Sequence, residues 1–160
     1  MRILIVSLML LMPLPALAGQ CDRWTAGMEE DEGGSVMAAR TCAPKGDLEI
    51  ELVAQCSGPD HLMVRYLPMT PPGKMDEQPE YKTTLEFKVG EQSFQHEAHF
   101  EGMDGALVID FAIASPMLAA MQTGASISVI DKSGLVPPAA FPLKGSRSAF
   151  EKLTKTCAKP

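Results

Sequence analysis

The residues of this chain best suited to binding a metal ion begin at His61-Leu62-Met63. In an extended strand, His61 and Met63 point to the same face, because side chains alternate between the two faces. Two further thioethers, Met69 and Met75, follow in the next segment. Imidazole and thioether groups together suit the soft ion Cu(I). The pattern predicts a copper site made by these four residues, unless the methionines only fill irregular space in a core.

A second candidate site combines Glu97, His99 and Asp110. The apolar pattern of the surrounding segments predicts antiparallel strands whose register sets Glu97 opposite Asp110, with His99 on the same face. Like charges in directly opposed positions are destabilising. The pair is therefore expected to be neutralised by solvent with Lys82 or Lys88, by a divalent cation, or by a basic partner that docks there.

The sequence has neither the serine-hydrolase motif nor the zinc-protease motif. It contains no G-x-S-x-G segment, and His96-Glu97-Ala98-His99 has one residue too few between its histidines for a zinc-protease motif. Strand alternation sends His96 to the apolar face, beside Leu85 and Phe111. We therefore expect a protein that is not an enzyme and that needs no cofactor, with copper as the alternative.

The first 18 residues have the pattern of a removable export signal. Arg2 precedes an apolar run, and small residues, Ala16 and Ala18, stand where cleavage would occur. The expected organisation is a signal peptide over 1–18 and one domain over 19–160. Such a protein would be periplasmic or secreted, with no membrane anchor after cleavage.

Four cysteines in an exported chain predict two disulfides, because export compartments are oxidising. Cys21, Cys42, Cys56 and Cys157 allow three pairings. A hairpin turning within the polar segment 29–34 would place Cys21 about opposite Cys42. That geometry favours Cys21 with Cys42 and leaves Cys56 for Cys157.

Alternation of apolar and polar residues indicates strands through most of the chain. The fold class predicted is all-β, a small antiparallel sandwich or meander, stapled by disulfides and carrying two short helices near the C-terminus. The first helix should start at Ser115-Pro116 and end at Gly124. Ser148 and Glu151 have the spacing of a capping box at the start of the second.

We expect helices over 116–124 and 146–157. We expect strands over 21–28, 35–42, 48–54, 62–66, 84–89, 93–100, 107–113, 127–129 and 139–143.

The last third of the chain resembles a family of small exported alphaproteobacterial proteins, the invasion-associated locus B-like proteins. The resemblance rests on Met117-Leu118-x-Ala120-Met121-x-x-Gly124-x-x-Ile127-x-Val129 and Phe141-x-Leu143-x-Gly145-Ser146-x-x-Ala149-Phe150-x-x-Leu153-x-x-x-Cys157. It implies a β-rich body, a short helix that ends in glycine before a strand, and a final strand followed by a Gly-led helix. It also implies a non-enzymatic envelope protein linked to host association.

The charge balance limits the classes of partner. Loss of Arg2 with the signal changes the net charge from −6 to −7, which disfavours nucleic acid and anionic membranes. The leading hypothesis is a non-catalytic exported protein that binds an unknown protein partner. The alternatives are a periplasmic metal-handling protein and an inhibitor of a cationic enzyme such as lysozyme, with the acidic segment Glu29 to Glu32 as a binding loop.

Overall fold

The computed structural model describes residues 21–31, 33–45, 48–68 and 81–157, so the predicted signal peptide lies outside them. In that part of the chain, nine antiparallel strands form one sheet in the order β1-β2-β3-β4-β7-β6-β5-β8-β9. The elements are β1 (Thr25–Asp31), β2 (Gly34–Lys45), β3 (Leu48–Gly58), β4 (His61–Leu67), β5 (Lys82–Val89), β6 (Gln92–Glu101), β7 (Ala106–Ala112), α1 (Pro116–Thr123), β8 (Ser126–Asp131), β9 (Ala139–Pro142) and α2 (Ser146–Cys157).

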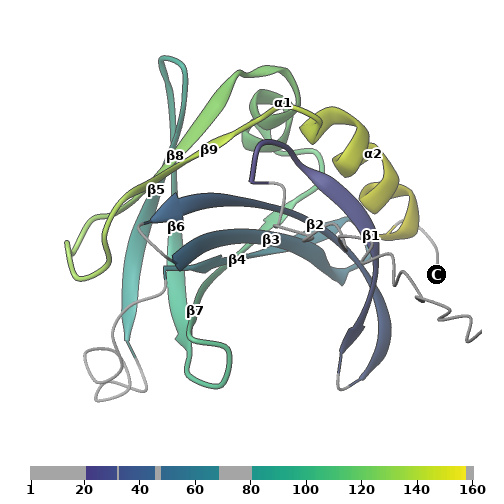
Figure 1. The fold of residues 1–160 in the computed structure, drawn as a ribbon, viewed down its shortest axis with the longest axis horizontal. Coiled ribbons are helices and arrows are strands. Elements are labelled where there is room, and N and C mark those ends of the chain that lie inside the picture. Colours follow the sequence, from purple (N-terminus) through teal and green to yellow (C-terminus); the bar gives the residue numbers. More distant parts are fainter. Residues whose placement is uncertain (1–20, 32, 46–47, 69–80, 158–160) are drawn as a thin grey trace, which may run out of the picture.

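The sheet curls into a half-barrel (Figure 1), and its last strand, β9, comes back to lie against β2. The prediction of an all-β domain with two C-terminal helices is confirmed, but the sandwich form is wrong. All the described strands belong to one continuous sheet, and the natural twist of that sheet curls it around the core. A second packed sheet is therefore not needed.

Local strand pairing follows the predicted register. β5 pairs with β6 so that Leu85 faces His96 and Phe87 faces Phe94. β6 pairs with β7 so that Phe100 faces Leu107. The order of the strands in the sheet differs from that of a simple meander. The strand next to β4 is β7, so β7, β6 and β5 follow β4 in reverse chain order.

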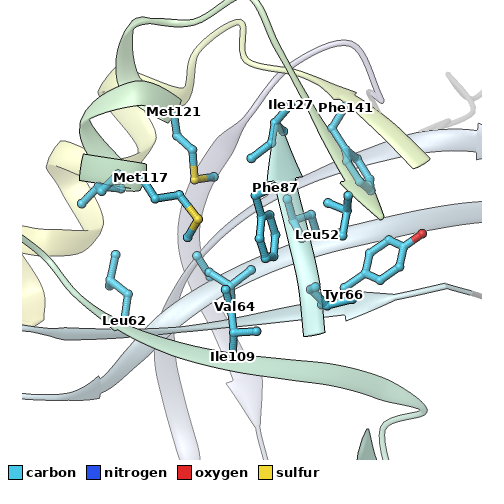
Figure 2. Close-up of a cluster of buried hydrophobic side chains, with 14 of the residues drawn as sticks. Leu52, Leu62, Val64, Tyr66, Phe87, Ile109, Met117, Met121, Ile127 and Phe141 are labelled. Atoms are coloured by element: carbon cyan, nitrogen blue, oxygen red, sulfur yellow. The ribbon is translucent and has the colours of Figure 1, made fainter. Parts of the chain in front are cut away.

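The core lies on the face of the sheet that the helices cover. Leu62, Val64 and Tyr66 of β4 are buried there, as their alternation predicts. Figure 2 shows the thioethers of Met117 and Met121 reaching from α1 toward the centre of this cluster. These two methionines are core residues. Neither helix in the described residues has the length and apolar character needed to cross a membrane.

Helix α1 begins where the sequence predicts, because the Ser115 hydroxyl accepts a hydrogen bond from the Leu118 backbone N–H at 3.2 Å. The glycine that ends this helix, Gly124, is not there to adopt the left-handed backbone conformation common at helix C-termini. Gly124 has a φ of −76°, which any residue can adopt. A Cβ there would lie 2.4 Å from Val89 Cγ1 and 3.0 Å from Leu143 Cδ1. Glycine is required by close packing.

Gly124→Ala should lower the free energy of unfolding by about 1–3 kcal/mol, because the new methyl group must displace core side chains. The matched control is Gly27→Ala in β1, where an added Cβ meets no atom within 4 Å. The control should change stability by less than about 0.5 kcal/mol. Urea unfolding of both variants measures the difference, and equal stabilities would contradict the packing argument.

Helix α2 starts at Ser146, so the capping box predicted at Ser148 and Glu151 is wrong: both residues lie inside the helix. The preceding Gly145 has a φ of +81°, and a Cβ there would lie 2.8 Å from the Trp24 carbonyl oxygen. The buried Ser146 hydroxyl donates to the Met121 carbonyl at 2.7 Å. Tertiary contacts therefore decide where α2 begins.

The two disulfides join Cys21 to Cys42 and Cys56 to Cys157, the pairing that the hairpin geometry favours. The first lies near the start of the β1–β2 hairpin. The second ties the end of α2 to β3 across the core. Both bonds fit an extracytoplasmic location, where disulfides persist.

A buried carboxylate organises the turn after β8. Asp131 is 5% exposed and accepts hydrogen bonds from the hydroxyls of Tyr81, Thr83 and Ser133. The backbone N–H groups of Ser133 and Val136 donate to it at 3.0 Å. Burial alone would raise the pKa of Asp131, but these hydrogen bonds outweigh it and hold the pKa below its usual value.

Candidate functional site

A charged groove of about 230 Å³ lies on the face of the sheet opposite the core. Figure 1 shows the β1–β2 hairpin and the turn between β6 and β7 projecting to the same side, away from the helices. The residues that line the groove come from both projections and from the strands between them: Glu29, Glu30, Asp31, Val36, Arg40, Glu51, Val53, Gln55, Arg65, Leu67 and Asp104.

Strand alternation explains which side chains reach this groove. Leu52 and Val64 point into the core, so their neighbours Val53 and Arg65 point to the opposite face. Arg40, Val53 and Arg65 are cross-strand partners on β2, β3 and β4. The groove therefore has a guanidinium group on each side of a buried valine.

The first of these, Arg40, lies 2.8 Å from the Glu29 carboxylate and 3.7 Å from that of Glu51. Its side chain is 45% exposed, so each ion pair is screened by water and stabilises the fold only weakly. The contacts nevertheless hold carboxylates of β1 and β3 around one cation at this wall of the groove.

The second, Arg65, is more deeply placed, with 20% of its side chain exposed. Its Nε lies 3.2 Å from Glu101 and 3.3 Å from Asp104, and its Nη1 donates to the Gln55 side chain. This arrangement fixes the β6–β7 turn against β4. Sequence reasoning does not single out Arg40 or Arg65, although a charged residue between the core positions Val64 and Tyr66 is a signal for the outward face.

The predicted acidic loop contributes to this groove. Glu29, Glu30 and Asp31 line it, whereas Glu32 lies outside the described residues. Altogether five carboxylates and two guanidinium groups line the groove, so it carries a net negative charge. Chemically, such a surface can accept lysine or arginine side chains, and its fixed arginines limit where these can bind.

The predicted copper ligands are partly located. His61 and Met63 lie on the outward face of β4, because Leu62 and Val64 between and beside them are buried in the core. His61 Nδ1 lies 2.6 Å from Asp110 Oδ1. The other predicted ligands, Met69 and Met75, lie outside the described residues.

Asp110 accepts a second hydrogen bond, from the Ser57 hydroxyl to Oδ2. The carboxylate therefore binds both the serine and His61, and the hydroxyl of the serine donates to the carboxylate, not to the imidazole. A hydrolase needs the histidine next to the nucleophile so that it can accept the proton. This cluster orients His61 and lacks the arrangement of a catalytic triad.

The predicted opposition of Glu97 and Asp110 is wrong. The ladder of β6 with β7 covers only His99–Glu101 against Ala106–Val108 and ends before either acidic residue. Asp110 lies opposite Met63 of β4, while Glu97 lies opposite Thr84 of β5. β7 pairs with β4 along its length, which draws it away from β6.

His99 contacts Glu101, a residue that the strand pattern does not single out. Its Nε2 lies 3.6 Å from Glu101 Oε1, on a side chain that is 56% exposed. The residues that the structure describes hold no group of three His, Cys, Asp or Glu side chains able to bind a metal ion. Glu97, His99 and Asp110 therefore do not come together as one cation site.

His96 occupies the apolar face, as predicted. Its ring centroid lies 6.1 Å from that of Phe87 and 5.7 Å from that of Phe111. Burial lowers the pKa of His96, so the imidazole is neutral at pH 7. This histidine packs between aromatic rings at the edge of the core.

Comparison with known proteins adds evidence about the fold. No family model matches the sequence, and no curated protein sequence matches it significantly. Among solved structures, invasion associated protein B from Bartonella henselae superposes with a TM-score of 0.57 at 13% sequence identity. The match covers 83% of this chain and 91% of that protein. This chain therefore shares the overall fold of invasion associated protein B.

Proposed function

We propose that this chain is a non-catalytic, exported interaction protein of the bacterial envelope, and that it binds a basic segment of a protein partner. The binding surface is the groove between the β1–β2 hairpin and the β6–β7 turn. The observation that carries the proposal is the acidic lining of that groove, contributed by strands far apart in the chain. The invasion-associated name of the structural neighbour supports a role at the host interface.

Electrostatics favours a cationic partner. The negative charge of the whole mature chain attracts such a partner from a distance, and the groove adds local carboxylates for it to meet. Arg40 and Arg65 are held by neighbouring carboxylates, so they occupy defined positions within this negative surface. A partner must place its own positive groups between them, which gives selectivity as well as attraction.

Charge reversal on both walls of the groove tests this proposal. Glu30→Lys and Asp104→Lys together replace one carboxylate from each projection. The matched control, Glu91→Lys with Glu97→Lys, makes the same change in net charge on exposed residues that do not line the groove. Circular dichroism and thermal unfolding establish that both variants are folded.

The partner is trapped by a photo-crosslinking residue at Val36, which lines the groove, and compared with the same residue at Gln95 on β6. A partner identified by mass spectrometry should crosslink at Val36 and not at Gln95. Its purified form should bind the groove variant about tenfold or more weakly, a loss of ~1.4 kcal/mol, and the control variant normally. Equal crosslinking at both positions, or equal affinities of the two variants, would overturn the proposal.

Lysozyme serves as a defined cationic probe for the inhibitor alternative. If the chain is such an inhibitor, it should slow cell-wall hydrolysis by lysozyme, and the groove variant should lose that effect. Undiminished lysozyme turnover in the presence of excess wild-type protein would remove the inhibitor alternative while leaving other basic partners open to the crosslinking test.

A further inference from the structure

We propose that His61 and Met63 bind one Cu(I) ion on the outward face of β4, with Asp110 as the residue that positions the imidazole. This inference is independent of the groove, because it uses different residues and a different ligand. It rests on a carboxylate–histidine pair, on the exposure of that histidine to solvent and on a neighbouring thioether.

The first observation is the pairing of His61 with Asp110. The Asp110 carboxylate can only accept, so a hydrogen bond of 2.6 Å to Nδ1 holds the ring proton on that nitrogen. The lone pair is then on Nε2, the nitrogen left to bind a metal. Metal-binding histidines are typically oriented by a carboxylate in this way. In the described part of the chain Asp110 is the partner of this imidazole, whose side chain is 52% exposed.

The second observation concerns the carboxylate itself. Its Oδ2 accepts from the Ser57 hydroxyl while its Oδ1 accepts from His61. Both oxygens are therefore engaged within the sheet, and the carboxylate is held in place from β3 and β4 together. Asp110 therefore supports the histidine through one oxygen while the other is held by the serine.

The third observation is the position of Met63. It lies directly opposite Asp110 in the β4–β7 ladder and two residues from His61 on the same face. Positions two apart on one strand are separated by about 7 Å between Cα atoms, a span that an imidazole and a flexible thioether can bridge together. Met63 is half-buried and His61 is exposed, so the methionine is the more buried of the two proposed ligands.

The donor set selects the metal. One imidazole nitrogen and one thioether sulfur are soft or borderline donors, which favour Cu(I). Zinc prefers three or four protein ligands, and the described residues hold no group of three His, Cys, Asp or Glu side chains suited to it. Cu(I) is stable with few soft ligands, so these two donors suffice to define a site for it.

The test is an anaerobic titration of the oxidised full-length mature protein with Cu(I), using bicinchoninate as a competing chelator. We expect the protein to remove one equivalent of Cu(I) from the chelator. His61→Ala and Met63→Leu should each weaken binding by about tenfold or more. His99→Ala and Met103→Leu are the matched controls, since they alter an exposed histidine and an exposed methionine elsewhere on the surface.

The role of Asp110 has its own measurement. Asp110→Asn should weaken Cu(I) binding by about 10- to 100-fold while leaving one equivalent bound. Nitrogen-15 shifts of the His61 ring in the metal-free protein should show the proton on Nδ1 in the wild type and a mixture of tautomers in the variant. Unchanged affinity and unchanged shifts would overturn the positioning role.

Three results would overturn the site as a whole. These are a wild type that removes no Cu(I) from the chelator, control variants that weaken binding as much as the site variants, and a double variant of His61 and Met63 that retains full affinity. Circular dichroism of each variant separates loss of the site from loss of the fold. None of these results bears on the groove, whose test uses no metal.

Discussion

Replacing Cys56 and Cys157 by alanine should lower the free energy of unfolding by about 4–5 kcal/mol, the largest effect expected of any disulfide change in this protein. The bond joins residues separated by 101 positions, so its loss frees most of the domain in the unfolded state. Cys157 is also 6% exposed and holds α2 against β3. Equilibrium unfolding in guanidinium chloride measures the difference.

The other disulfide provides the control for this prediction. Cys21 and Cys42 are separated by only 21 positions, so their double alanine variant should lose about 3 kcal/mol. The difference between the variants isolates the effect of loop length, because each loses one disulfide. If the shorter loop proved the more costly to open, the stabilisation would come from native contacts around the β1–β2 hairpin and not from the entropy of the unfolded chain.

Asp131→Ala should destabilise the fold by about 3–5 kcal/mol. The substitution leaves the hydroxyls of Tyr81, Thr83 and Ser133 and two backbone N–H groups without the buried acceptor that they share. Each donor left without a partner costs about 1–3 kcal/mol, and partial hydration of the turn reduces the sum. Urea unfolding measures the loss. Thr83→Val, which removes one donor and keeps the acceptor, should cost about 1 kcal/mol.

The same carboxylate makes stability depend on pH. Its pKa in the folded protein is lowered, so the folded state favours the ionised form more than the unfolded chain does. The resulting stabilisation is complete above the unfolded pKa, near 3.8, and is lost as the pH falls through the lower folded value. Asp131→Asn should therefore flatten the acid side of the stability profile. An unchanged profile would show that other carboxylates dominate acid unfolding.

Much of the local structure could be predicted from the sequence. The alternation that places Leu85 opposite His96 and Phe100 opposite Leu107 predicts the correct register, because only that register buries all the apolar residues of each hairpin on one face. The pairing of Cys21 with Cys42 follows from the same short-range geometry. In each case the interacting residues are joined by a turn whose length limits the choices.

The candidate sites depended more on contacts between distant strands. The partner of Asp110 was predicted to be Glu97, from the neighbouring hairpin strand, but β7 pairs instead with β4 and brings Asp110 to His61. Likewise, Arg40 and Arg65 lie far apart in the chain. They line the same groove because each is a cross-strand neighbour of Val53. No periodic pattern specifies which strands become neighbours in the sheet.

By itself, the sequence determined the β-rich class, the two C-terminal helices, the hairpin registers and which residues of each strand face the core. These properties depend on side-chain alternation and turn chemistry, which act over a few residues. The tertiary structure alone decided the strand order, the curl of the sheet, the groove, the partner of Asp110 and the close packing that requires glycine at Gly124 and Gly145. Those features arise where segments distant in the chain compete to cover the same core, and the outcome depends on the packing of the whole domain.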